Sequence, residues 1–312
     1  MKATHSRRDF LKISAAGAMG ALIYTPEIYS SGIMPSAVRS VQDPKMFGLG
    51  LQLYTIRDAM KADVLGSLKK VSLLGYKYLE LADYTKGLFY GFQPGEFKKI
   101  VNDLGMEVLS SHTQVEAQGI TLDNAKKMAD DHAKLGVRYC IQPWVVPEAR
   151  NLSGYQKMVA DWNKVGKIMK ETGIQFGYHN HNFEFQSLDG KVPYFDIFLK
   201  ELDKDLVTME LDLFWAVKGG QDPVELFRKY PGRFELFHIK DMFTEQKPFF
   251  TTDGVEDFAP VGEGVIDFKR ILAEKETAGL KFMFVEQDRT KDGQPFDAIQ
   301  KSITNLTTKI LV

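Results

Sequence analysis

The feature of this 312-residue sequence that most constrains its fold is a repeated unit, a short apolar segment followed by an amphipathic one. Eight such units recur. Successive strands start about 30 residues apart, the length that a βαβ unit needs, and the last interval is longer. Alternating strands and helices without hairpin signals indicate a parallel sheet. Eight units predict an α/β fold, a single-domain (β/α)8 TIM barrel, because a closed sheet leaves no unpaired edge. The expected strands begin at or near Phe47, Tyr76, Glu107, Tyr139, Gln175, Val207, Phe234 and Lys281.

The segments between these strands are typical of helices. Apolar residues recur at helical spacing over residues 125–135 and 155–169. The expected helix ends are marked by Gly75, Gly105, Gly136, Gly173 and Gly279, and the expected starts by Pro94, Pro193, Pro223 and Pro295. The longer last interval contains an insertion over 243–264, which a barrel places on its catalytic face. No G-x-G-x-x-G follows the first strand, so a dinucleotide-binding fold loses support.

The beginning of the chain predicts an export signal. Residues 6–12 read S-R-R-x-F-L-K, which resembles the bacterial twin-arginine signal residue for residue. Residues 13–24 are uncharged and shorter than the about 20 residues that span a bilayer. We therefore expect residues 1–40 to be a twin-arginine signal peptide and linker, followed by a barrel over 45–312. The expected location is the bacterial periplasm, without stable membrane insertion after processing.

The composition excludes several classes of protein. Lys and Arg total 40 and Asp and Glu total 41, a balance that argues against a nucleic-acid partner. The single cysteine, Cys140, excludes an internal disulfide and a cysteine-rich zinc module. Six histidines and many carboxylates leave a His/Asp/Glu metal site open. Assembly into a homo-oligomer is also left open.

Polar and aromatic residues gather at the expected strand ends, where barrels of this type place their active sites. The first four strands end with Gln52, Tyr54, Glu80, His112, Gln142 and Trp144. The last four end with His179, His181, Glu184, Asp212, Trp215, His238, Lys240 and Glu286. Packing alone does not explain apolar strands that all finish in this way.

Several of these residues predict a site for one divalent metal ion. Asp212, His238 and Glu286 supply one ligand each from the sixth, seventh and eighth strands. A fourth ligand is expected from the fifth strand, and the candidates are His179, His181 and Glu184. Carboxylates with imidazole suit Mn²⁺, Mg²⁺, Co²⁺ or Zn²⁺, and ligand type alone does not choose among these ions.

Six motifs resemble those of xylose isomerase-like TIM barrels, the sugar phosphate isomerase/epimerase superfamily. They are L-Q-L-Y-T-I-R-D (51–58), Y-H-N-H-N-F-E-F (178–185), E-L-D-L-F-W (210–215), H-I-K-D (238–241), V-G-E-G (261–264) and F-V-E (284–286). The likeness covers almost all of the chain after the export signal. Relatives in this superfamily include ketose 3-epimerases, hydroxypyruvate isomerases, inosose dehydratases, barrels that act on 3-keto-glucosides, and metal-dependent AP endonucleases.

The resemblance implies a ligand set. Ketose epimerases bind one divalent metal through Glu, Asp, His and Glu on strands five to eight, and the last three match this chain by type and strand. Their Glu-x-x-Asn pattern is replaced by His-Asn-His-Asn at residues 179–182. We expect Glu184 to be the fourth ligand because of its type, with His181 as the second choice. The endonucleases carry Asp-x-x-His where this chain has Asp212-x-x-Trp215, so DNA repair is not expected.

The chemistry expected of such a site is proton abstraction next to a carbonyl, through an enediolate that the metal stabilises. We expect Glu286 to be the base, with His179 or His181 in the second proton transfer and Lys240 near an oxyanion or hydroxyl. Glu184 is also expected among the catalytic groups. The expected substrate contacts are Gln52, Tyr54, Glu80, His112, Gln142, Trp144 and Trp215. No cluster of Arg or Gly suggests a phosphate clamp, which favours a neutral carbohydrate.

These expectations describe an enzyme, a metal-dependent sugar isomerase or epimerase acting on a small carbohydrate. The first alternative is a lyase or dehydratase on keto-sugars or 3-keto-glucosides, because the Y-H-x-H motif resembles inosose dehydratases and 3-keto-glucoside barrels more than ketose epimerases. The second alternative is a sugar-binding barrel without catalysis, which would not need a full metal set.

Overall fold

The structure is a computed structural model that describes residues 48–113, 119–187, 192–245 and 247–312. The predicted export signal lies outside the described residues. Among the helices that are described, none is long and apolar enough to cross a membrane.

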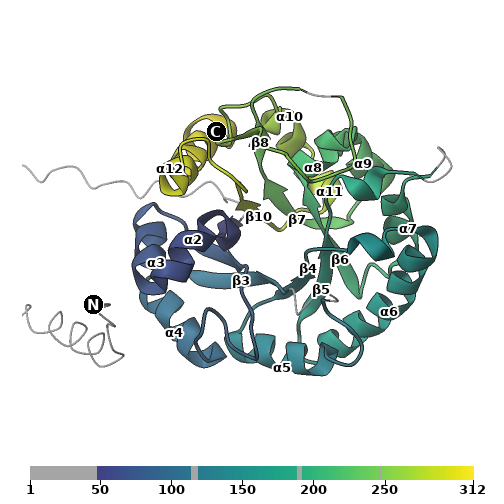
Figure 1. The fold of residues 1–312 in the computed structure, drawn as a ribbon, viewed down its shortest axis with the longest axis horizontal. Coiled ribbons are helices and arrows are strands. Elements are labelled where there is room, and N and C mark those ends of the chain that lie inside the picture. The colour runs from purple at the N-terminus through teal and green to yellow at the C-terminus, as the bar shows by residue number, and fades with distance from the viewer. Residues whose placement is uncertain (1–47, 114–118, 188–191, 246) are drawn as a thin grey trace, which may run out of the picture. The chain divides into compact units, whose positions relative to one another are not determined.

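The described residues form a closed barrel of eight parallel strands, in the order β1-β10-β7-β6-β5-β4-β3-β2 (Figure 1). This confirms the predicted (β/α)8 barrel. β1 pairs with both β2 and β10, which closes the sheet. The strands are β1 (Gly48–Gln52), β2 (Tyr78–Leu81), β3 (Glu107–His112), β4 (Tyr139–Gln142), β5 (Gln175–His179), β6 (Val207–Asp212), β7 (Phe234–Ile239) and β10 (Phe282–Val285).

Helices surround the barrel as an outer ring (Figure 1). They are α2 (Arg57–Ala62), α3 (Val64–Leu73), α4 (Pro94–Asp103), α5 (Ala125–Leu135), α6 (Leu152–Lys170), α7 (Tyr194–Glu201), α8 (Leu213–Lys218), α9 (Pro223–Lys229), α10 (Phe268–Ala273), α11 (Lys275–Ala278) and α12 (Pro295–Asn305). Short helical segments are η1 (Leu53–Ile56), η2 (Pro147–Ala149), η3 (Phe183–Phe185) and η4 (Leu306–Ile310). The first strand ends at Gln52, so Tyr54, which was expected at the strand end, lies in η1.

The predicted helix signals act as expected at several ends. Pro94, Pro223 and Pro295 each occupy the first turn of a helix, where the missing N–H breaks no bond. Gly136 ends α5 with a φ of 86°, a conformation that suits glycine because it has no Cβ.

Alternation along the strands decides which side chains enter the barrel, and β5 shows how. Tyr178 faces the outer helices, with its ring centroid 5.0 Å from those of Trp162 in α6 and Phe198 in α7. Its neighbour Gly177 faces inward, where a Cβ would lie 2.6 Å from a methyl carbon of Ile141. The next inward-facing residue is His179, the last residue of β5, so its side chain reaches the barrel mouth.

The insertion after β7 contains a small hairpin of β8 (Asp241–Met242) and β9 (Phe258–Ala259). The buried carboxylate of Asp241 accepts hydrogen bonds from four backbone N–H groups, those of Met242, Gly262, Gly264 and Ile266. A Cβ on Gly264 would lie 2.3 Å from Oδ1 of Asp241, so the approach requires glycine. The H-I-K-D and V-G-E-G motifs therefore meet, and their contact fixes the insertion at the barrel mouth.

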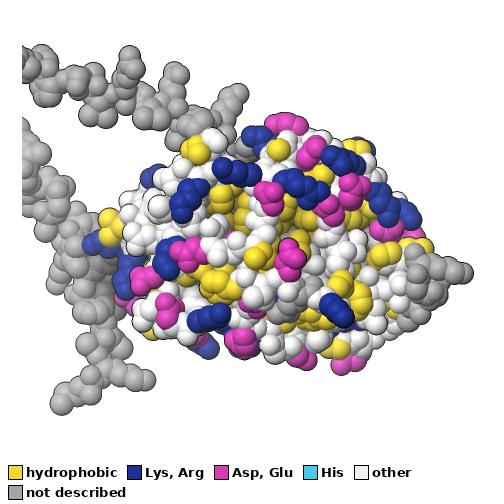
Figure 2. Space-filling view, turned by 90° about the horizontal axis from the view of Figure 1, so that it is seen from above, with side chains coloured by type: hydrophobic (Ala, Val, Ile, Leu, Met, Phe, Trp, Pro, Cys, Tyr) yellow, Lys and Arg dark blue, Asp and Glu magenta, His cyan; other side chains and the backbone are white. Residues whose placement is uncertain are grey.

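The surface agrees with the balanced composition. On the face seen in Figure 2, Lys and Arg side chains are interspersed with Asp and Glu, and no large patch of one sign appears there.

Candidate active site

A cavity of about 470 Å³ opens at the C-terminal ends of the barrel strands, where the sequence predicts the active site. Eight predicted site residues line it: Tyr54, His112, Trp144, His179, His181, Trp215, Lys240 and Glu286. The other predicted residues do not line it and are buried: Gln52, Glu80, Gln142, Glu184, Asp212 and His238. Asp288 and two arginines, Arg57 and Arg289, also line the cavity and are not among the residues predicted from the sequence.

Three predicted metal ligands converge beside this cavity. Asp212 ends β6, His238 lies on β7 and Glu286 follows β10, which are neighbouring strands. Their ligand atoms lie within 4.8 Å of one another. Nδ1 of His238 is 2.8 Å from Oε2 of Glu286 and 3.8 Å from Oδ2 of Asp212. The group offers one imidazole nitrogen and two carboxylates, which divalent metals accept as ligands in proteins.

The environment of these carboxylates fits a bound cation. Oδ2 of Asp212 is buried and accepts no hydrogen bond from the described residues. The ammonium of Lys240 lies 3.1 Å from this oxygen and 2.7 Å from Oε2 of Glu286. Buried carboxylates need positive charge beside them, and here one ammonium pairs with both. A divalent ion among the three ligands would supply further positive charge and coordinate Oδ2 of Asp212.

The candidates for a fourth ligand lie on different sides of β5. The carboxylate of Glu184, in η3, accepts hydrogen bonds from the hydroxyl of Tyr178 and the backbone N–H of His181. Because Tyr178 faces the outer helices, Glu184 is held on the outer side of β5, away from the metal ligands and the cavity. His179 points inward instead, and its Nε2 is 3.8 Å from Oδ2 of Asp212. The structure thus places His179, and not Glu184, beside Asp212, and Glu184 lies apart from the predicted metal ligands and from the cavity.

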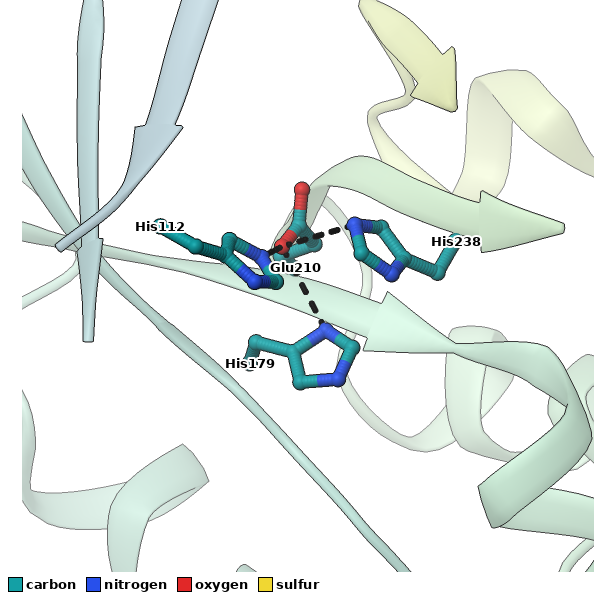
Figure 3. A group of neighbouring side chains, drawn as sticks. All are labelled: His112, His179, Glu210 and His238. Carbon is teal, nitrogen blue, oxygen red and sulfur yellow. Dashed lines mark hydrogen bonds and ion pairs between the residues drawn. The ribbon is translucent and has the colours of Figure 1, made fainter. Parts of the chain in front are cut away.

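A second polar group, drawn in Figure 3, shares His238 with the first. Its members His112, His179, Glu210 and His238 have ligand atoms within 4.8 Å of one another. Nε2 of His112 is 2.6 Å from Oε2 of Glu210. Sequence reasoning missed Glu210, although it begins the E-L-D-L-F-W motif. The alternation of the strand was the available signal, because Glu210 and Asp212 are two residues apart and face the same side.

Three residues predicted to contact substrate make hydrogen bonds to other protein groups instead. Glu80 is 2.5 Å from Nε2 of His238 and accepts a hydrogen bond from the amide of Gln52. Gln142 accepts a hydrogen bond from the backbone N–H of Ile120 and donates one to the carbonyl of Trp144. The structure therefore corrects the roles of Gln52, Glu80 and Gln142, whose side chains hold neighbouring groups instead of lining the cavity.

Burial and neighbouring charges set the protonation of the buried cluster. Desolvation raises the pKa of Glu210 to about 7, raises that of Glu80, and lowers the pKa of His112 to about 4. Burial alone would lower the pKa of His238 as well, but Glu210, Glu286 and Glu80 outweigh it and raise this pKa well above its usual range. The positive charge of protonated His238 is therefore stabilised by carboxylates that would also bind a divalent ion. Binding of the ion would require His238 to lose a proton.

His181 belongs to neither ligand group. Its ring lies against two aromatic residues of the cavity wall, with centroids 4.8 Å from Trp144 and 5.5 Å from Trp215. Its Nδ1 is buried and has no hydrogen-bond partner among the described residues. Desolvation, followed by the ammonium of Lys240, lowers the pKa of His181 well below its usual range. The ring is therefore neutral near pH 7.

Glu286 and Asp288 differ in proton affinity although they are two residues apart. Burial alone raises the pKa of Glu286, but Lys240 and His238 outweigh it and hold this pKa well below its usual range. Asp288 accepts a hydrogen bond of 2.9 Å from Nζ of Lys240, and burial raises its pKa to about 6. Glu286 is therefore suited to be a ligand and poorly suited to be a base, whereas Asp288 titrates near neutral pH.

The model of the xylose isomerase-like TIM barrel family matches residues 68–308. The chain belongs to this family. This confirms the resemblance drawn from the motifs, and the family is one of enzymes.

Several curated relatives are named inosose dehydratase. The protein of Geobacillus kaustophilus is 25% identical over 255 residues, which cover 71% of this chain and 79% of the relative. The protein of Clostridium tetani is 31% identical over 137 residues, 40% of this chain and 45% of the relative. The chain thus spans about half the length of some relatives that it matches and more of others.

Solved structures include similar barrels. A sugar phosphate isomerase/epimerase from Parabacteroides distasonis is 30% identical, with a TM-score of 0.71 over 88% of this chain and 99% of that one. The IolI protein, whose structure contains a zinc atom, is 18% identical with a TM-score of 0.66 over 84% of this chain and 99% of its own, and shows the shared fold.

Proposed function

We propose that this protein is a metal-dependent carbon–oxygen lyase. It removes the proton next to the carbonyl of a keto-sugar or keto-cyclitol and then releases a group from the β-carbon. The observation that carries the proposal is that His179, the last residue of β5, and His181, two residues beyond it, both line the cavity, where a two-carboxylate epimerase would place a glutamate. The names of the inosose dehydratase relatives support the same reaction.

The ion would be held by Nε2 of His179, Nδ1 of His238 and the carboxylates of Asp212 and Glu286. These nitrogen and oxygen donors suit Mn²⁺, Co²⁺ or Zn²⁺ better than Mg²⁺. When bound, such an ion supplies positive charge that stabilises the negative charge developing on a substrate carbonyl oxygen.

His181 is the base in this proposal. Its neutral ring lines the cavity, and Trp144 and Trp215 fix it from two directions. Glu286, the base expected from the sequence, is a metal ligand in this proposal, and its Oε2 already pairs with Lys240 and His238. Nδ1 of His181, in contrast, has no hydrogen-bond partner among the described residues. The proposal therefore moves the base from Glu286, after β10, to His181, after β5.

Asp288 supplies the proton that the leaving group needs. It lines the cavity, and burial raises its pKa to about 6, so a protonated fraction is present near neutral pH. His181 takes the proton from carbon, the bond from the β-carbon to oxygen breaks, and the leaving oxygen receives the proton of Asp288. The net change is loss of water from a free hydroxyl, or of an alcohol from a glycoside.

A second candidate is the isomerase or epimerase expected from the sequence. It shares the first proton transfer, and the Parabacteroides distasonis relative favours it. The two reactions differ afterwards, because an isomerase returns the proton to another carbon or face and releases no group.

The test uses the metal-loaded protein with a keto-inositol, a 3-keto-glucoside and a keto-hexose in D₂O, followed by proton NMR. The proposal predicts an unsaturated or diketone product together with released water or alcohol. Deuterium exchange with an isomeric product and no release would establish the isomerase instead. Binding without exchange or release in any substrate would indicate a sugar-binding barrel.

A further inference from the structure

We propose that Glu210 is a positioning residue that orients three histidines from inside the barrel and aims two of them at the metal. The inference rests on the proposed function for the identity of the metal ligands, and on the contacts of Glu210 for everything else. Glu210 would touch neither substrate nor metal, and would act through the imidazole rings.

The contacts of Glu210 converge on one atom (Figure 3). Its Oε2 is 2.6 Å from Nε2 of His112, 3.3 Å from Nδ1 of His179 and 3.3 Å from Nε2 of His238. The three rings come from β3, β5 and β7, so a single carboxylate connects three strands. Glu210 is fully buried, which leaves no bulk water to replace it.

The ring nitrogens facing Glu210 are opposite those facing the metal ligands. His179 directs Nδ1 to Glu210 and Nε2 to Asp212, at 3.3 and 3.8 Å. His238 directs Nε2 to Glu210 and Nδ1 to Glu286, at 3.3 and 2.8 Å. A histidine that donates one N–H to a carboxylate presents the lone pair of its other nitrogen, which is how carboxylates fix metal-binding imidazoles.

Each ring depends on Glu210 to a different degree. Nδ1 of His179 is buried and makes no hydrogen bond to the described residues, so the carboxylate at 3.3 Å is its nearby charge partner. Nε2 of His238 is also 2.5 Å from Oε2 of Glu80. Glu80 is itself held by Gln52 and by the hydroxyl of Ser110. Loss of Glu210 should therefore affect His179 more than His238.

The same four residues could instead bind a second ion, because their ligand atoms are equally close. In that case His179 and His238 would each bridge two ions through both ring nitrogens, which requires both rings to lose their last N–H proton. Orientation by a carboxylate needs no such deprotonation, so we favour it.

The experiment compares Glu210→Gln and Glu210→Asp with wild type and with Glu235→Gln. Glu235 is a matched control because it also lies on a barrel strand, where it accepts a hydrogen bond from Tyr139. Mn²⁺ or Co²⁺ affinity is measured by chelator competition, and imidazole ¹⁵N shifts are recorded on the metal-free proteins. Glutamine keeps the size of the side chain but removes its negative charge, and a neutral amide oxygen is a weaker acceptor for imidazole N–H groups than a carboxylate oxygen.

We expect Glu210→Gln to lose about 10- to 100-fold in metal affinity and to change the tautomer signal of His179 most. Glu210→Asp should recover part of the affinity because it keeps the charge, and it provides the test if the glutamine variant does not fold. Wild-type affinity and unchanged ¹⁵N shifts in both variants would overturn the proposal. Two ions per wild-type chain, with one lost in Glu210→Gln, would also overturn it. Both readouts need no substrate, so a failed lyase assay leaves them decisive.

Discussion

At the residue scale, two histidines at the end of β5 distinguish this site from one built on paired carboxylates. The sequence could place His179, Asp212, His238 and Glu286 together, because strand ends of a parallel barrel meet at one mouth. The position of Glu184 could not be predicted from the sequence. That position depends on the turn after β5, where the side chain of Asn180 accepts a hydrogen bond from the backbone N–H of Asp212.

Replacement of His181 tests the proposed base. His181→Asn should keep metal binding and lose about 10²- to 10⁴-fold in the rate of deuterium exchange next to the substrate carbonyl, the usual contribution of a general base. Glu286→Gln is the contrasting variant and should lose metal affinity first. Exchange and metal content are measured by NMR and elemental analysis. Wild-type exchange in His181→Asn would return the role of base to Glu286.

A buried histidine outside the site predicts a pH dependence of stability. His132 is fully buried between the hydroxyl of Thr113 and the carbonyl of Met128, and burial lowers its pKa to about 4. Below about pH 6.5 the unfolded chain takes up a proton that the folded protein does not, so stability is lost as the pH falls towards 4. Between pH 7 and pH 5 this residue should cost about 2 kcal/mol.

Chemical unfolding of wild type and His132→Gln at both pH values measures this difference. The variant should lose about 2 kcal/mol less than wild type over the same interval, whatever its stability at pH 7. Parallel losses in the two proteins would show that His132 does not carry the effect.

At the element scale, the side chain of Asp241 joins the start of the insertion to its end. The H-I-K-D and V-G-E-G motifs could be read from the sequence, but their contact could not, because it joins residues 20 or more positions apart through backbone N–H groups. Once Asp241 is seen to bind those groups, both glycines are explained. Gly264 has no room for a Cβ, and Gly262 has a φ of 82°. The aromatic and apolar residues of the insertion then form part of the cavity wall, with Val255 and Phe258 as examples.

Asp241→Ala should therefore destabilise the protein by about 3 kcal/mol and expose the insertion to proteolysis, because buried N–H groups lose a charged acceptor. Glu263→Ala is the control, since that exposed side chain pairs only with Lys301 in the described contacts. Unfolding free energy and the cleavage sites from limited proteolysis measure the effect. Equal stability of the two variants would contradict the anchoring role of Asp241.

At the scale of the whole molecule, the repeat of eight units was enough to predict the barrel, because each unit must bury an apolar strand beneath an amphipathic helix. The positions of the inward side chains followed from alternation along each strand. The contacts of Gln52, Glu80 and Glu210 inside the barrel could not be predicted in this way, because residues at the same barrel mouth can lie at different distances below its opening. Export of the whole barrel stays a prediction from the twin-arginine motif.

Replacement of Arg7 and Arg8 by lysine tests that export. The proposal predicts that the double variant remains in the cytoplasm of the native host or a twin-arginine-competent bacterium, while the wild-type chain reaches the periplasm. Cell fractionation with immunoblotting measures the distribution. Equal periplasmic amounts of the two proteins would exclude this route.

The central claim is a single divalent ion held by two histidines and two carboxylates at the ends of β5, β6, β7 and β10. The most direct test is anomalous diffraction from crystals of the protein loaded with Mn²⁺ or Co²⁺. The account predicts one anomalous peak, within about 2.0–2.3 Å of His179, Asp212, His238 and Glu286. A peak on Glu184, a peak on Glu210 or no peak in this cavity would contradict it.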